Sequence, residues 1–79
     1  MIIQTLNTKY TLTDKGDGAF LMEGNPYFFP RPLMVTPLDP PVVGKPFWIK
    51  FLEGDRKGHR MITSKVVKVV HDDGKVEAV

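Results

Sequence analysis

All seven prolines of this 79-residue chain lie between Pro26 and Pro46, where they separate two segments of more regular pattern. Proline has a fixed φ and no backbone N–H, so the stretches around these residues are stiff, extended connections that cannot donate ladder hydrogen bonds. The longest windows without Gly or Pro are residues 1–15 and 59–73. Both windows are rich in Thr, Ile, Val and Tyr, which favour strands. The sequence therefore predicts an all-β protein.

The segment before the prolines has the pattern of a hairpin. Residues 10–13 alternate apolar with polar side chains, 14–18 contain the glycines of a tight loop, and 19–22 form a short apolar return. Ile2 and Ile3 add an earlier strand. We therefore expect two or three short strands here.

The segment after the prolines has the pattern of an antiparallel meander. Its predicted parts are a strand at 47–52, a charged tip at 53–58, a long strand at 60–70, and a turn at 72–74 that leads into 75–79. If Phe47, Ile49 and Phe51 fill the core, Trp48, Lys50 and Leu52 face the other way.

Two lysines of the long strand indicate an irregularity. Lys65 and Lys68 are separated by an odd number of positions, so a regular strand cannot place both in water. A β-bulge within residues 63–67 resolves this conflict, and it bends the strand so that it serves two faces of a small barrel. We expect a single domain, residues 1–79, built as a small SH3-like or partly open barrel.

The interval 26–46 is expected to form a proline-rich arm of this domain. Residues 33–36 are long enough for one edge strand, and three consecutive rings, at positions 27–29, are flanked by prolines. The rings either face outward as interface anchors or turn inward and close the barrel. A rigid segment loses little conformational entropy on docking, which favours a non-catalytic protein-interaction module or self-association through the edge strand. The expected protein-binding residues are Tyr27, Phe28, Phe29, Arg31 and Met34.

Charge and aromatic content support an alternative, a barrel that binds single-stranded nucleic acid. The formal net charge is +2: residues 1–44 hold three cations and four acidic residues, and residues 45–79 hold eight and five. Small barrels bind single strands by stacking bases on aromatic rings set among cations. Cations on strand edges also have a protective role against aggregation. The residues of this alternative are Trp48, Lys50, Arg56, Lys57, Arg60, Lys65 and Lys68.

Other function classes find little support in the sequence. Cysteine is absent, and His59 and His71 are the only histidines, one beside a charged turn and one beside a hairpin. Residues 71–73 are expected to form a strand end and a polar turn, because no further ligand has a suitable spacing for a metal. We therefore expect no enzyme, no cofactor and no metal. No apolar run approaches the roughly 20 residues of a membrane span, so no membrane is expected and the expected location is the cytoplasm.

Two motifs resemble known proteins. Residues 42–47 followed by a meander resemble the start of the central strands in SH3-like and Sm-like barrels. Thr63-Ser64-Lys65-Val66, which opens a valine-rich strand before a short hairpin, resembles the C-terminal part of small bacteriophage and bacterial proteins of uncharacterised function. In those proteins a further strand with a Ser-x-Tyr element follows, which this chain lacks. The resemblance implies a small β-barrel and is compatible with a phage accessory protein, a virion component or an inhibitor of a host protein, in the virion or the host cytoplasm.

Overall fold

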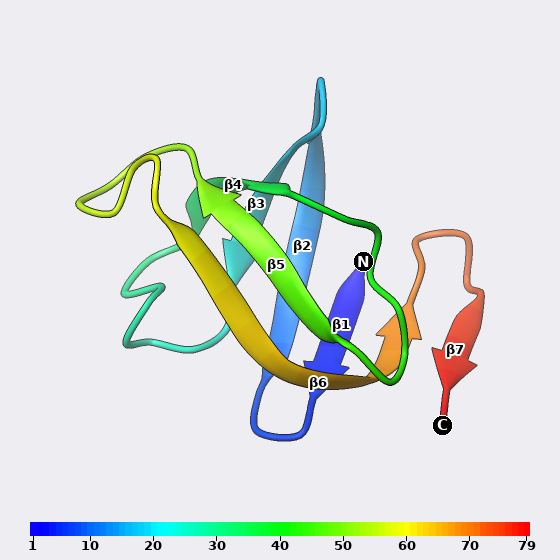
Figure 1. The fold of residues 1–79 in the computed structure, drawn as a ribbon. Helices are drawn as coiled ribbons and strands as arrows, with labels where there is room; N and C mark the ends of the chain where they lie inside the picture. The colour runs from blue at the N-terminus through cyan, green and yellow to red at the C-terminus, as the bar shows by residue number, and fades with distance from the viewer.

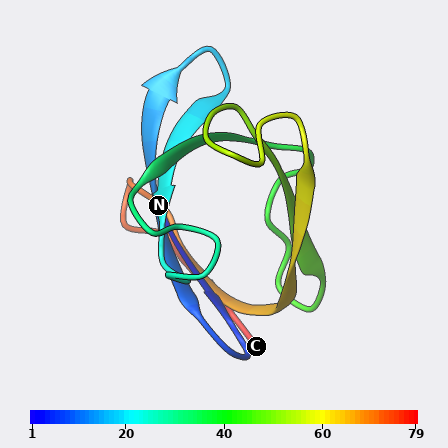
Figure 2. The ribbon, with the colours of Figure 1, turned by 90° about the vertical axis from the view of Figure 1, so that its left-hand side faces the viewer.

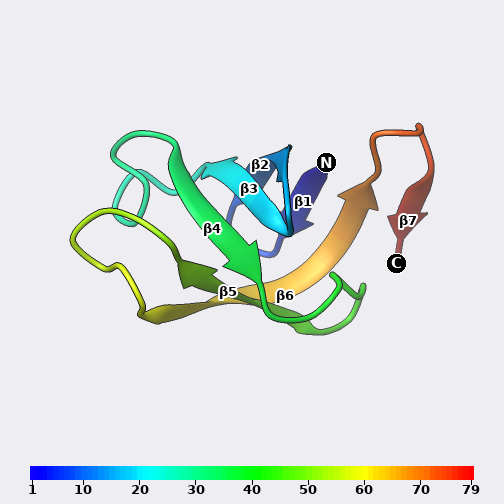
Figure 3. The same ribbon diagram turned by 90° about the horizontal axis from the view of Figure 1, so that it is seen from above.

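The computed structural model describes all 79 residues. The chain forms seven strands joined by loops and turns, and it has no helix (Figure 1). It therefore contains no helix that could cross a membrane. The strands are β1 (Ile2–Thr5), β2 (Lys9–Gly16), β3 (Ala19–Glu23), β4 (Leu33–Pro37), β5 (Pro46–Phe51), β6 (Arg60–Val70) and β7 (Val76–Ala78). They form one antiparallel sheet in chain order, and an added pairing of β1 with β6 closes the first six into a barrel. Figure 2 shows this ring, and Figure 3 shows β7 outside it. The predicted all-β meander barrel is confirmed, and the barrel is closed.

The first hairpin turns where the sequence predicts. Asp17 and Gly18 both have positive φ, 56° and 77°, as a two-residue type I′ turn requires. Strand β2 is longer than expected, because it continues through Asp14 and Lys15 to Gly16, which pairs with Ala19. The ladder register shifts between Asp14 and Gly16, so a bulge absorbs part of the predicted loop.

Strand β6 closes the barrel because its two halves have different partners. Residues 60–65 pair with β5, and residues 66–70 pair with β1. Strand β7 then pairs with residues 68–70, on the stretch of β6 that lies beyond β5. Figure 3 shows β6 curving from one side of the molecule to the other.

The bulge predicted in the long strand is confirmed. Between the pairs Pro46–Lys65 and Trp48–Ile62, three steps along β6 match two along β5. A second register shift faces β1, between Gln4 and Thr5. As a result Lys65 and Lys68 are both exposed, while the valines that follow each of them, Val66 and Val69, are fully buried.

The core consists of thirteen buried apolar side chains contributed by six strands and the arm. Strand β5 shows the expected alternation, with Phe47, Ile49 and Phe51 inside and Trp48 and Lys50 outside. The other buried apolar residues are Ile3, Tyr10, Leu12, Met22, Phe29, Leu33, Val35, Met61, Val66 and Val69.

The proline-rich arm differs from the sequence-based expectation in one respect. Strand β4 is not an edge strand: it pairs with β3 through Leu33, Met34 and Val35 and with β5 through Val35, Thr36 and Pro37. In a closed meander every strand of the barrel has two neighbours, so β4 offers no free edge to a partner. The prolines bracket the strand and do not interrupt it, because Pro37 is its last residue.

The three consecutive rings of the arm have different environments. Phe29 is buried, 4% exposed, with its ring centroid 5.5 Å from that of Phe51 and 6.2 Å from that of Tyr10. Phe28 is half-buried against the core, and Tyr27 is 71% exposed. Of the two orientations expected for these rings, Phe29 therefore has the inward one, and its ring helps to close the barrel.

Phe29→Ala is expected to lower the free energy of unfolding by about 3–5 kcal/mol, since it removes a buried ring and leaves a cavity. Tyr27→Ala is the matched control, and its expected cost is about 1 kcal/mol or less, because the lost contacts are at the surface. Urea denaturation followed by circular dichroism measures both. Equal losses for the two variants would contradict the different burial of the two rings.

Candidate nucleic-acid interface

The outer surface of β5 and β6 carries charge of one sign. These two strands contain four cations, Lys50, Arg60, Lys65 and Lys68, and no acidic residue. All four are exposed. The rest of the chain has seven cations and nine acidic residues, so the positive charge of the protein is concentrated on this hairpin. We call its outer surface the β5–β6 face.

Strand register places the central residues of this face next to one another. Trp48 lies opposite Ile62, and Lys50 lies opposite Arg60. Trp48 is 40% exposed and Ile62 is 48% exposed, so a partly open aromatic ring and an aliphatic side chain adjoin two cations. Like charges directly opposite each other destabilise an antiparallel pair. The Lys50–Arg60 pair therefore weakens the hairpin and attracts an anion.

None of these four cations makes an ion pair within the protein. The three ion pairs of the molecule join the Met1 amino group to Asp72, Arg31 to Glu53, and His71 to Glu77. None involves a residue of β5 or β6. The charges of the β5–β6 face are thus available to a ligand.

Two hollows, with volumes of about 290 and 500 Å³, lie beside Trp48. One is lined by Leu38, Asp39, Trp48 and Arg60, and the other by Asp39, Pro40, Val42, Lys45, Pro46 and Trp48. The end of the arm forms their far wall, held in place where the Leu38 N–H donates to the Trp48 carbonyl oxygen at 3.0 Å. Asp39 is the single acidic residue in either hollow. The Trp48 side chain therefore borders open space, and the cations Lys45 and Arg60 line the same hollows.

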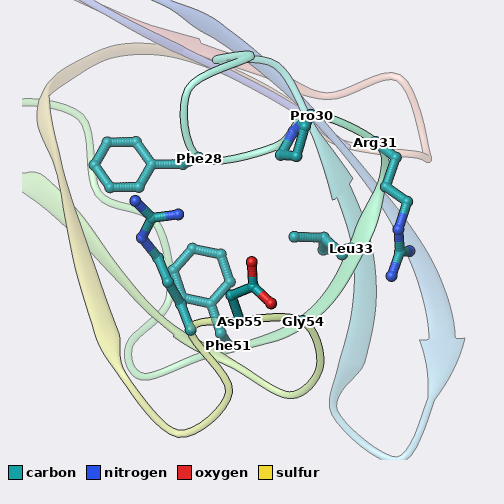
Figure 4. Close-up of a pocket in the computed structure, with 8 residues that line it drawn as sticks. Phe28, Pro30, Arg31, Leu33, Phe51, Gly54 and Asp55 are labelled. Carbon is teal, nitrogen blue, oxygen red and sulfur yellow. The ribbon is translucent and has the colours of Figure 1, made fainter.

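A third depression, the barrel-end cleft, lies where the arm meets the β5–β6 tip. Its volume is about 160 Å³, below the roughly 300–1,000 Å³ of small-molecule pockets. In Figure 4 the side chain of Arg31 extends away from the other residues of the cleft. The lining residues are Phe28, Pro30, Arg31, Leu33, Phe51, Gly54, Asp55 and Arg56.

Arg56 joins the two sets of residues that the sequence analysis treated as alternatives. Its guanidinium carbon lies 5.2 Å from the ring centroid of Tyr27 and 5.1 Å from that of Phe28. The two rings meet edge to face, with centroids 4.9 Å apart. These are cation–π distances, so a cation of the tip rests on the aromatic residues of the arm.

Glu53 holds the arm to the tip by its carboxylate. The Met34 N–H donates to Glu53 Oε2 at 2.7 Å, and the Leu52 N–H donates to the Met34 carbonyl oxygen at 2.9 Å. Together these bonds continue the β4–β5 ladder beyond the strands. The Arg31 guanidinium is 4.0 Å from the same carboxylate and is largely exposed, so its contribution is small.

The remaining predicted residues are spread over the surface. Arg31 and Lys57 are exposed near the barrel-end cleft, and Met34 is half-buried in β4. Two residues that were not among the predicted ones, Ile62 and Lys45, also lie beside Trp48. Ile62 could be paired with Trp48 only once the position of the bulge in β6 was known.

No group of three or more His, Asp or Glu side chains is placed to hold a metal ion.

Comparison of the chain with protein-family models, with curated proteins and with solved structures finds no match. The structure therefore establishes the fold alone, a small six-strand antiparallel barrel with one strand outside it.

Glu53→Ala is expected to lower the free energy of unfolding by about 1–2 kcal/mol, because the Met34 N–H loses its charged acceptor. Glu53→Gln retains an acceptor oxygen and should recover most of that loss. Arg31→Ala should change stability by less than about 0.5 kcal/mol. Chemical denaturation of the three variants tests this order, and a larger loss for Arg31→Ala than for Glu53→Ala would contradict it.

Proposed function

We propose that this protein binds single-stranded nucleic acid, largely without sequence preference, through the β5–β6 face. The observation that carries the proposal is that β5 and β6 hold four exposed cations and no acidic residue, and that two of these cations, Lys50 and Arg60, adjoin the partly exposed ring of Trp48. Electrostatic attraction to phosphates supplies most of the affinity of such binders, and stacking supplies the rest. Any base can stack on an indole, so this arrangement favours binding independent of sequence.

The proposed contacts follow from the side chains. Lys50, Arg60, Lys65 and Lys68 contact backbone phosphates, and Trp48 stacks on a base. Four phosphate contacts on a single strand give a slope of log K against log salt of about −3, because each contact contributes about −0.7. A net charge of only +2 fits modest affinity, since the rest of the protein is slightly acidic.

A second candidate is a protein-interaction module that docks through the same face. It is favoured by three aliphatic side chains near Trp48, those of Leu38, Val42 and Ile62, which are exposed and do not stack on bases. Apolar residues with an aromatic centre and a charged rim are typical of protein interfaces. The edge-strand route predicted for β4 is not part of this candidate, because β4 is paired on both sides.

The biological setting proposed for either function is that of a phage accessory protein, in the virion or the host cytoplasm. Its support is the resemblance of the strand opening with Thr63 and Ser64 to small phage and bacterial proteins. The small size of the barrel is compatible with that setting.

Binding of a 12-nucleotide oligothymidylate is expected to quench the fluorescence of Trp48, the one tryptophan in the chain. Raising the salt should weaken binding with a slope near −3, and the double variant Lys50→Gln/Arg60→Gln should reduce that slope by about 1.4. Lys15→Gln, which removes an exposed cation at the tip of the β2–β3 hairpin, is the matched control and should leave the slope unchanged. Absence of quenching, or salt-independent binding, would reject the proposal.

Light scattering of the pure protein tests the second candidate in the form of self-association. That candidate predicts an oligomer that Ile62→Ser dissociates, because the substitution removes exposed apolar surface without changing charge. The nucleic-acid proposal predicts a monomer without oligonucleotide. An oligomer that dissociates in this way, combined with no oligonucleotide binding, would favour the second candidate over the first.

A further inference from the structure

We infer that Tyr27 is a second stacking platform for a nucleobase, at the end of the barrel, used together with Trp48 by one bound strand. The inference rests on the proposed function and extends it: it assigns to nucleic acid a ring that the sequence analysis assigned to protein docking. Tyr27 is the most exposed aromatic side chain of the molecule, at 71%, and base stacking needs an open ring face.

Hydrogen bonds hold the backbone that carries this exposed ring. The Asn25 side-chain oxygen accepts the Tyr27 N–H at 2.9 Å, and the Asn25 carbonyl oxygen accepts the Phe29 N–H at 2.8 Å. Phe29 then anchors the turn in the core. Before the turn, Gly24 lies so close to β2 that a Cβ there would be 2.8 Å from the Lys9 carbonyl oxygen. Because this backbone is already ordered, little backbone entropy is lost when a base stacks on the ring.

Arg56 supplies a cation beside the ring. It makes no ion pair, and its side chain donates no hydrogen bond, so its interactions in the free protein are with the faces of Tyr27 and Phe28. The guanidinium N–H groups are therefore free to donate to a phosphate while the cation–π contacts persist. Tyr27 and Arg56 at the barrel end thus form a pair of ring and cation, like the pair that Trp48 forms with the cations beside it.

The two platforms lie within reach of one strand. The arm turn and the 52–59 tip lie at the same end of the barrel (Figures 1 and 3). Trp48 and Arg56 are eight residues apart, so their Cα atoms are separated by at most about 29 Å, while β5 alone carries the chain about 10 Å from Trp48 to Phe51. A stacked strand advances about 3.4 Å per nucleotide. Twelve nucleotides therefore span both platforms, whereas three span about 7 Å and occupy only one.

The difference in length provides the test. Tyr27→Ala is expected to weaken binding of the 12-nucleotide oligothymidylate about 5- to 150-fold, the loss produced by removing one stacked base. It should leave the quenching of Trp48 by a trinucleotide unchanged at low salt. Tyr27→Phe keeps the ring and should bind both lengths as the natural protein does. Arg56 adds a fifth phosphate contact for the 12-mer, so the slope for this length is about −3.5, and Arg56→Gln should return it to about −2.8.

The outcomes separate this inference from the function beneath it. If the natural protein binds neither length, both the proposed function and the inference fail. If the 12-mer binds with Trp48 quenching but Tyr27→Ala has no effect on its affinity, the inference alone fails. Equal weakening of the trinucleotide and the 12-mer by Tyr27→Ala would also overturn it, since the substitution would then be acting on the Trp48 site. A thermal unfolding curve of Tyr27→Ala like that of the natural protein shows that the variant is folded.

Discussion

The pairing of β6 with both β5 and β1 is the interaction on which this barrel depends. Six short strands enclose a core only if the last of them returns to the first, and β6 does so by changing partners halfway along its length. Two register shifts make the bend, and the valines after each exposed lysine point inward, with Val66 and Val69 fully buried. Without the bend, β1 and β6 would both be open edges over an uncovered core. The same bend turns the lysines of β6 toward solvent, so closure of the barrel and formation of the charged face have one cause.

The arm shows how a small protein can use one short segment for two purposes. Phe29 enters the core between Tyr10 and Phe51, and two residues earlier Tyr27 is held at the surface against Arg56. Burial of the first ring positions the backbone of the second, because the hydrogen bonds to Asn25 order the turn that joins them. In a 79-residue domain a single core residue contributes a large part of the free energy of unfolding. The position of Tyr27 at the barrel end therefore depends on the same buried ring, Phe29, that stabilises the fold.

The sequence predicts the local features of the structure well and its non-local pairings less well. The Asp17-Gly18 turn, the alternation of β5 and the bulge in β6 follow from residue spacing, which is available in the chain. That β4 has two neighbours follows from closure by β1 and β6, strands at opposite ends of the sequence, and no pattern within residues 33–36 reports it. The prolines around positions 27–29 remove the periodicity that would have shown which ring turns inward. The contact of Arg56 with the arm joins two loops, so it too could be found only from the fold.

The charges of the β5–β6 face lower the stability of the protein, and the fold does not require them. Lysine and arginine on strands often protect an exposed edge from aggregation. That role does not fit Lys50, because it lies on a strand with neighbours on both sides, opposite Thr36 on β4 and opposite a second cation, Arg60, on β6. Repulsion between Lys50 and Arg60 destabilises the pair, and neither side chain makes an ion pair with an acidic residue. An acidic residue at either position would strengthen the hairpin at no cost to the core, since both side chains point outward. A ligand with closely spaced negative charges relieves this repulsion on binding, and the phosphates of a single strand that stacks on the neighbouring Trp48 have that spacing and that charge.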